Sequence, residues 1–499
     1  MTSIYSGETF NMARQQFENV ADFLDLRTDK RERIFMPKRA IAVTCPIHRD
    51  DGTVAVYEGY RVQHHLALGP TKGGTRFAPG VDMGAIRVIP FLFVCYLFNY
   101  LDRVNVGFAK LQMLDELRMT ETVYGLGAGI FFIGYLACGV PSNLALQHFG
   151  ARRWISVMMV AWGLFSTTLM FVKTPTEFYA VRFLTGASEA GFFPGIVLYL
   201  TRWFPRAQQG RVMTFFMAAI PISGVLGGPV SGWILAHFSR SSSTLAAWQW
   251  LYLLQGLPTV LLGFSVWFIL SDGIEAATWL DSGERAALQQ NIAFDESSAS
   301  PAAADSLGDV IRNLSIWSLG IVYFCIQSGV YAINFWLPTI IKSNGEANPF
   351  TIGLMSAVPY LAAVLFMLAM GRSADLRSER RWHLAVPLIV GAAGLLIAAT
   401  TQSSPIVSLA GMTLAAMGAL TGLPMFWPLT NRYLTASAAA GGLALINSIG
   451  QIAGFASPYL VGRIKDATGG TSYALMVLAV AMLVGATLAL RVPAQRASA

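Results

Sequence analysis

From residue 88 onward, the chain is a series of apolar stretches separated by short polar segments. Each stretch is long enough to form a helix that crosses ~30 Å of hydrocarbon, which takes about 20 residues. The stretches lie at 88–110, 122–146, 152–172, 176–203, 211–237, 246–270, 314–341, 350–371, 383–401, 404–431, 437–464 and 470–491. The pattern therefore predicts twelve membrane-spanning helices, six on each side of a polar gap.

The polar gap, residues 271–312, predicts a short amphipathic helix at 277–291 followed by a flexible cytoplasmic linker rich in serine and alanine. A six-plus-six arrangement is typical of two structural repeats with a substrate site between them. We expect helices 1–6 within 86–270, helices 7–12 within 313–491, and a short polar tail at 492–499.

The first 84 residues follow a different pattern, that of a small soluble α/β segment. They predict an amphipathic helix at 11–26 and two strands, Arg39–Pro46 and Thr53–Tyr60, around a polar turn at 49–52. Charged residues fill 21 of these 84 positions but only 42 of the remaining 415. The start does not have the pattern of a signal peptide, because its apolar positions are scattered among charged ones.

Composition excludes several classes of protein. The whole chain is 54% hydrophobic and 13% charged, with a mean hydropathy of +0.51, whereas soluble domains carry about 25% charged residues. The net charge of +7 does not indicate a nucleic-acid partner, because most basic residues lie in short loops. The four cysteines have neither disulfide nor metal-site spacing, so we expect no disulfide framework and no metal. They are Cys45, Cys95, Cys138 and Cys325.

The loops differ in their content of Lys and Arg, which sets the orientation of a membrane protein. The loops on the side of the central linker, with the C-terminal tail, carry 14 of these residues, and the loops on the opposite side carry 7. The bias predicts that both termini and the linker are cytoplasmic.

Four charged residues fall inside the apolar stretches, where each costs roughly 2.5–3.5 kcal/mol on the insertion scale. Asp102 and Arg103 lie in the first stretch, and Arg182 and Glu189 share one face of the fourth. The two positive and two negative charges cancel, so the four residues could form ion pairs that only stabilise the structure. Alternatively, the buried carboxylates could load and release protons while a guanidinium binds a carboxylate substrate bidentately.

The sequence around these charges resembles the anion:cation symporter family of the major facilitator superfamily. The resemblance is carried by NYLDRVNVGFA at 99–109, RFLTGASEAGFFPG at 182–195, YLTRWFP at 199–205 and EAATWLDSGER at 275–285. It covers about four-fifths of the chain. It implies a twelve-helix transporter that takes up organic anions such as phthalate, hydroxyphenylacetate, tartrate or sugar acids together with protons, with a monomeric transport unit and no cofactor.

The resemblance also implies roles for individual residues. Asp102 and Glu189 match proton-carrying positions, with Arg182 as the partner of Glu189. Arg103 matches a substrate anchor, which we expect Asp102 to neutralise at rest, and Asn447 matches a position that contacts substrate in sugar-acid permeases. To these substrate-binding residues we add Arg182, as a second guanidinium, Tyr100, as a candidate determinant of pocket shape, and Gln451, as a polar group on the same helix as Asn447.

The soluble segment resembles the N-terminus of glutamate and related amino-acid dehydrogenases. The similar stretches are PKRAIAVTCP at 37–46, EGYRVQHH at 58–65 and GPTKGGTRF at 69–77, in which Lys72 matches a substrate-contacting lysine. No Gly-x-Gly-x-x-Gly fingerprint follows a strand anywhere in the chain, so we expect no dinucleotide site and no enzyme activity. A gene fusion or a wrongly assigned start, with Met83 as the first residue, would explain the fragment.

Two alternatives to uptake remain at this stage. The stretch from Gly224 to Gly232 resembles the helix 5 motif of exchangers, which favours an exporter or antiporter. A membrane-tethered dehydrogenase fragment is the remote alternative. We expect a multi-pass protein located in the cell membrane, such as the inner membrane of a bacterium.

Overall fold

The computed structural model of the chain describes residues 39–48, 54–63, 83–204, 216–239, 244–275, 312–377, 379–430 and 439–492, with a few isolated positions between them. The chain divides into two compact units, Met1–Pro79 and Gly80–Ala499. The predicted helices at 11–26 and 277–291 lie outside the described ranges.

The first unit contains an antiparallel β-hairpin. Strand β1 (Arg39–His48) pairs with β2 (Val54–Gln63), in a register that runs from Arg39 opposite Gln63 to His48 opposite Val54. Pro46 lies within β1 opposite Val56 and has no N–H to donate to a ladder hydrogen bond. Both predicted strands are confirmed, and each extends two or three residues further than the sequence pattern indicated.

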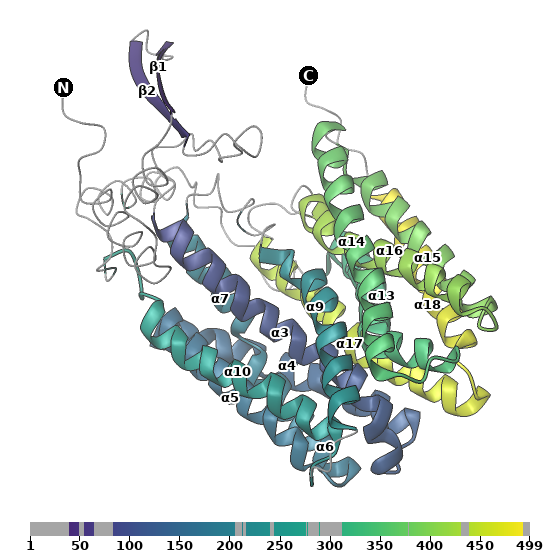
Figure 1. The fold of residues 1–499 in the computed structure, drawn as a ribbon. Coiled ribbons are helices and arrows are strands. Elements are labelled where there is room, and N and C mark those ends of the chain that lie inside the picture. Colours follow the sequence, from purple (N-terminus) through teal and green to yellow (C-terminus); the bar gives the residue numbers. More distant parts are fainter. Residues whose placement is uncertain are drawn as a thin grey trace. The chain divides into compact units, whose positions relative to one another are not determined.

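Gly80–Ala499 is built from two sets of helices, which Figure 1 shows in purple to teal and in green to yellow. The first half contains α3 (Met83–Glu116), α4 (Glu121–Phe149), α5 (Ala151–Thr168), the 3₁₀ turn η1 (Leu169–Phe171), α6 (Pro175–Glu189), α7 (Phe192–Trp203), α9 (Ala219–Phe238) and α10 (Ala247–Ile269). The second half contains α13 (Leu314–Ser343), α14 (Pro349–Arg377), α15 (Arg381–Thr400), α16 (Pro405–Thr430), α17 (Ala439–Thr468) and α18 (Ser472–Arg491).

Local sequence explains where several of these helices begin. Thr120 and Thr174 precede α4 and α6, and each side-chain oxygen accepts a hydrogen bond from the backbone N–H three residues later. Asn313 similarly caps α13 through the N–H of Ser315. Such caps satisfy N–H groups that have no partner inside the helix.

The fourth apolar stretch is broken, which corrects the prediction of one continuous helix over 176–203. Helix α6 ends at Glu189 and α7 begins at Phe192. Pro194 lies in the first turn of α7 and cannot donate a backbone hydrogen bond to Ala190. At Gly191, a Cβ would lie 2.0 Å from the hydroxyl of Ser142 on α4, so this turn packs where only glycine fits.

Ten spans in the described part of the chain are long and apolar enough to cross a membrane, with α6 and the start of α7 counted as one. Together with α3 and α17, they form the twelve expected spanning segments. Large apolar side chains point outward, among them Leu144 at 62% exposure and Phe268 at 83%. Lipid can cover such a surface, whereas water would make it an aggregation site.

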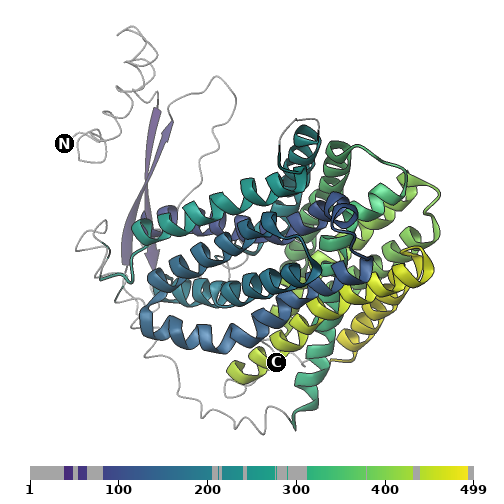
Figure 2. The same ribbon diagram turned by 90° about the horizontal axis from the view of Figure 1, so that it is seen from below.

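The two halves meet through corresponding pairs of helices. Helix α4 of the first half packs against α17 of the second, α9 packs against α14, and α3 contacts α13. Helices α4 and α14 are the second helix of their halves, and α9 and α17 are the fifth. Each of the first two pairs therefore joins a second helix to a fifth helix, as expected if the halves are structural repeats. Figure 2 gives a second view of these helices. Glycines allow the close contacts: a Cβ on Gly125 would lie 2.3 Å from the carbonyl oxygen of Pro458, and one on Gly353 would lie 2.3 Å from that of Gly228.

Candidate transport site

A buried ion pair joins α3 to the end of α6. The guanidinium of Arg103 donates from Nε to Oε1 of Glu189 over 2.8 Å, and its Nη2 donates to the same oxygen. Arg103 is 7% exposed and Glu189 1%. The ring centres of Tyr100, Phe131 and Tyr135 lie 4.9, 5.4 and 5.7 Å from the guanidinium carbon. The cation is therefore held by one carboxylate and three aromatic faces.

Asp102 lies apart from this pair, in a shell of neutral donors. Its carboxylate accepts from the indole of Trp162 at 3.1 Å and from the hydroxyls of Ser166 and Thr259 at 3.2 Å each. The expectation that Asp102 neutralises Arg103 is wrong. Consecutive residues point roughly 100° apart around a helix, so Asp102 faces α5 and α10 while Arg103 faces α4 and α6.

Arg182 does not pair with Glu189, contrary to the prediction from their shared helix face. Its guanidinium carbon lies 4.7 Å from the ring centre of Phe131, and Nη2 donates to the carbonyl of Ala128 over a long 3.5 Å. Arg182 is 1% exposed, and its Nε has no hydrogen-bond partner among the described residues. Because Arg103 occupies the Glu189 carboxylate, Arg182 remains a buried cation without a carboxylate in contact within the described ranges.

The second half contributes a chain of neutral polar groups. Tyr331 on α13 donates its hydroxyl to Oε1 of Gln451 on α17 at 3.0 Å, and Gln327 donates to the same hydroxyl at 3.3 Å. Asn447 is half-buried one turn before Gln451.

A row of aromatic rings connects the two polar groups across the halves. Phe131, beside Arg103, has its ring centre 5.0 Å from that of Phe132, and Phe132 lies 4.4 Å from Tyr331 of the second half. Arg103, Glu189, Tyr100 and Gln451 are therefore linked through contacts on α3, α4, α6, α13 and α17. Asp102 and Arg182 border this region from within the first half.

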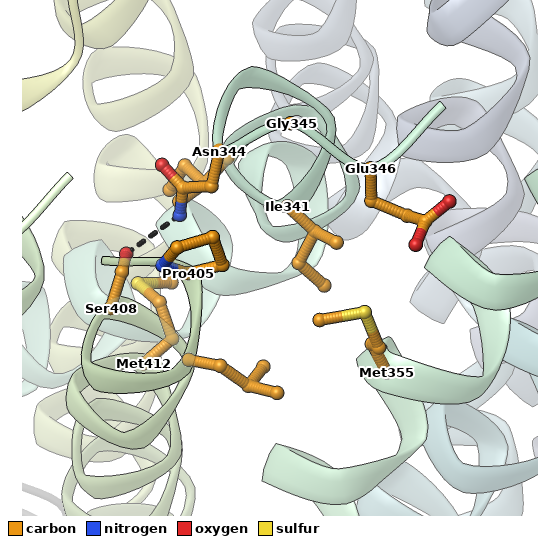
Figure 3. Close-up of a pocket in the computed structure, with 10 residues that line it drawn as sticks. Ile341, Asn344, Gly345, Glu346, Met355, Pro405, Ser408 and Met412 are labelled. Atoms are coloured by element: carbon orange, nitrogen blue, oxygen red, sulfur yellow. Dashed lines mark hydrogen bonds between the residues drawn. The ribbon is translucent and has the colours of Figure 1, made fainter. Parts of the chain in front are cut away.

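A cavity of about 210 Å³ lies elsewhere, within the second half (Figure 3). It is bordered by the end of α13 and the beginnings of α14 and α16, where Asn344 donates to the hydroxyl of Ser408 over 2.8 Å. Figure 3 shows the side chains of Ile341 and Met355 pointing toward the same space, with Glu346 on the same side as Met355. None of the predicted site residues borders this cavity.

The sequence did not single out the residues that hold Asp102. Trp162 and Ser166 are four residues apart on α5, and Thr259 lies on α10; all three are less than 2% exposed. The sequence signal for these partners was a set of polar side chains at helical spacing within apolar stretches. This signal is weak, because many such side chains form hydrogen bonds only to the backbone of their own helix. In the described part of the chain, no group of three His, Cys, Asp or Glu side chains is placed to hold a metal ion.

Comparison with known proteins settles the family. The family model of the Major Facilitator Superfamily matches residues 92–458 and, in a second alignment, 319–498. The chain belongs to this superfamily. The Glu/Leu/Phe/Val dehydrogenase dimerisation domain matches residues 37–107, so that alignment begins in the soluble segment and continues into α3.

Individual relatives extend this result. A putative metabolite transport protein, NicT, of Pseudomonas putida is 43% identical over 82% of this chain and 93% of its own. A putative tartrate transporter of Agrobacterium vitis is 40% identical over 81% and 92%. The inward-open xylose transporter XylE from E. coli has the same fold, with a TM-score of 0.65 at 15% identity over 84% of this chain and 98% of its own. The chain is thus a membrane transporter with the major facilitator fold.

Proposed function

We propose that this protein takes up a small organic carboxylate together with protons. The observation that carries the proposal is the buried pair between Arg103 and Glu189. Glu189 occupies the guanidinium that a substrate carboxylate would need, so the two carboxylates compete for one cation. A proton on Glu189 removes one competitor, which couples proton binding to anion binding.

The geometry suggests an order of events. A proton neutralises Glu189, the Arg103 fork becomes free, and the substrate carboxylate takes its place among Tyr100, Phe131 and Tyr135. The halves then reorient around the site, as in other transporters built from repeats. When Glu189 loses its proton on the other side, it binds Arg103 again and displaces the substrate.

Asp102 serves as a second proton site in this proposal. Its donors are all neutral: Trp162, Ser166, Thr259 and, at a longer distance, Asn105. A proton can therefore be added without breaking an ion pair, while the positive charge of Arg182 remains within the same half.

The Lys and Arg distribution supports an orientation with both termini cytoplasmic, in the inner membrane of a bacterium. The end at which α4 begins then faces away from the cytoplasm, and the two halves are in contact at that end. A monomer contains both halves and therefore a whole site, so the proposed transport unit is a single chain.

Export or exchange is the competing function. One relative, 35% identical over 80% of this chain and 91% of its own, is named a quinolone resistance transporter of Acinetobacter baumannii. The glycines from Gly224 to Gly232 are also compatible with an exchanger: Gly224, Gly228 and Gly232 pack against α14, and Gly227 packs against α3. Proton antiport requires proton and substrate to compete for one site, whereas the Arg103–Glu189 pair favours their joint binding.

An uptake screen tests the proposal and narrows the substrate. Proteoliposomes are loaded at high internal pH and offered labelled tartrate, sugar acids and aromatic acids such as phthalate. The rings around Arg103 favour the aromatic acids, and the chain of Gln327, Tyr331 and Gln451 favours hydroxylated ones. Accumulation that collapses with a protonophore is expected, and proton-driven loss of preloaded substrate would instead establish export.

A further inference from the structure

Four charged side chains join the two halves at the end of the bundle where α4 begins. Lys110 on α3 and Glu121 on α4 belong to the first half, and Lys465 and Asp466 on α17 belong to the second. These four residues are named the Glu121 cluster here. The Glu121 carboxylate bridges the halves, with Oε2 at 2.5 Å from Nζ of Lys110 and Oε1 at 2.5 Å from Nζ of Lys465.

Asp466 completes the N-terminal cap of α4 from the other half. Its two carboxylate oxygens accept from the backbone N–H groups of Glu121 at 3.1 Å and Thr122 at 2.7 Å, and also from the Thr122 hydroxyl. The cap within the first half, Thr120, accepts only from Val123. Two of the N–H groups that every helix leaves free at its start are therefore bonded only when the halves are together.

The contacts around the cluster leave no space between the halves. The Lys110 side chain is 2% exposed, and its Nζ lies 3.4 Å from the ring centre of Trp336 in the second half. A Cβ on Gly462 of α17 would lie 2.3 Å from the carbonyl oxygen of Glu121. Nearby, Lys342 of α13 donates to the carbonyl of Leu111 on α3 over 2.8 Å.

Each half contributes one acidic and one basic residue to the cluster. Lys110 and Glu121 remain together if the halves separate, whereas Lys465 is half-buried and Asp466 is exposed, so water can solvate both. Separation therefore leaves no buried charge without an opposite charge nearby, which is the arrangement that would be strongly unfavourable. What separation removes is the pairing of Glu121 with Lys465, the shared helix cap and the cation–π contact. These contacts favour closure, yet they can be broken reversibly.

We propose that the Glu121 cluster is a gate that sets the equilibrium between states closed and open at this end of the protein. The contacts between the halves favour the closed state whether or not a substrate is bound. It goes beyond the proposed function, because it depends on neither the identity of the substrate nor the proton-coupling residues.

Distance measurements between the halves test the gate. In a background with all four cysteines replaced by alanine, spin labels are attached at Lys173→Cys and Ser403→Cys. Both positions are exposed, lie at this end and belong to different halves. Double electron–electron resonance is recorded on purified, spin-labelled protein in nanodiscs without substrate. We expect one main short distance for the parent protein.

Weakening the cluster should populate a longer distance. Asp466→Asn removes the charge from the shared cap, and Gly462→Ala inserts a methyl group between the halves. Each should raise the ratio of open to closed molecules at least about fivefold, as expected for losing a coupling of ordinary size. Lys465→Ala, at a partly solvent-exposed position, gives the same test if either variant fails to fold.

Two substitutions at the same end serve as matched controls. Glu116 accepts from the indole of Trp248 within the first half at 2.6 Å, so Glu116→Gln removes a carboxylate that joins no halves. A Cβ on Gly470 would meet no atom within 4 Å, so Gly470→Ala adds a methyl group without a clash. Both should leave the distance distribution unchanged. If folded cluster variants give the same distance distribution as the parent protein, the cluster is not a gate. The distance measurement does not depend on uptake, so a failure to detect uptake of any substrate would not change its outcome.

Discussion

Arg103 is a cation whose neighbours suit a planar group. Three rings surround the guanidinium, and the Glu189 carboxylate lies at its edge, where Nε and Nη2 both donate. An ammonium has neither the flat face nor the fork of donors that this setting uses. The chemistry of the site therefore depends on the shape of this side chain as well as on its charge.

Arg103→Lys should insert and fold normally but bind substrate at least about tenfold more weakly, a loss of about 1.4 kcal/mol. The charge is kept, and the bidentate geometry is lost. Substrate affinity and melting temperature measured on the same purified variant check this. Unchanged affinity with lowered stability would identify a structural arginine instead.

Glu189→Gln should abolish uptake driven by a pH gradient while leaving substrate binding or counterflow exchange measurable. The amide resembles a permanently protonated acid and cannot titrate. Initial rates with and without a pH gradient in proteoliposomes distinguish the two activities. Gradient-driven accumulation that persists in the variant would leave Asp102 as the acid to test.

Counting charges identified these residues from the sequence, because a charge in an apolar stretch is costly wherever it points. Their partners could not be predicted in the same way. Which acid meets Arg103 depends on the rotation of α3 relative to α6, and that rotation is fixed by packing with distant segments. Asp102 and Arg103 are adjacent in sequence and face different helices, so sequence proximity gave the wrong pair.

At the scale of helices, apolar length was sufficient to place most membrane spans to within a few residues, whereas α3 and α14 extend about six residues further than the apolar pattern. The break after Glu189 was missed because both flanking segments are apolar, although Gly191 and Pro194 were a visible signal in the sequence. The close approach of α4 at Gly191 is a tertiary contact, which hydropathy does not show. Helix contacts made through glycine are similarly invisible in hydropathy.

Gly186→Ala should destabilise the first half, by about 1–3 kcal/mol for an overpacked site. A Cβ at this position on α6 would lie 1.9 Å from the carbonyl oxygen of Phe131 on α4, and backbone cannot move aside cheaply. Gly139→Ala on α4 has nothing within 4 Å and is the control. Melting temperatures in detergent should fall for the first variant alone, and equal values would contradict the packing argument.

Glu379 should make the stability of α15 depend on pH. Partial burial acts to raise its pKa, but bonds from the backbone N–H of Trp382 and from His383 outweigh it and hold the pKa below the ordinary 4.5. The carboxylate therefore stabilises the helix fully above pH 4.5, and this contribution is lost as the pH falls through the lower folded value. Glu379→Ala should cost about 1 kcal/mol at pH 7. Melting curves of variant and parent should converge under acid, and a constant difference would exclude this role of the Glu379 carboxylate at the start of α15.

At the scale of the whole molecule, the chain divides into the N-terminal unit, Met1–Pro79, and the helical unit, Gly80–Ala499. Deleting residues 1–82 should leave insertion and uptake intact, because the described part of this segment contributes a hairpin and no spanning helix. Uptake per molecule of protein, quantified by immunoblot in membrane fractions, measures this. Normal expression with lost uptake would give the segment a role in transport.

The exchange of one carboxylate for another at Arg103 determines which part of the proton gradient can drive transport. If a single proton neutralises Glu189 and a monovalent anion replaces it, the loaded site carries the same net charge as the empty one. The membrane potential then does no work on loading, and one pH unit supports an accumulation of about tenfold, or 1.36 kcal/mol. If Asp102 carries a second proton, one positive charge moves inward in each cycle, and 100 mV adds about 2.3 kcal/mol. The number of protons bound thus determines whether the cell draws on its pH gradient alone or also on its voltage.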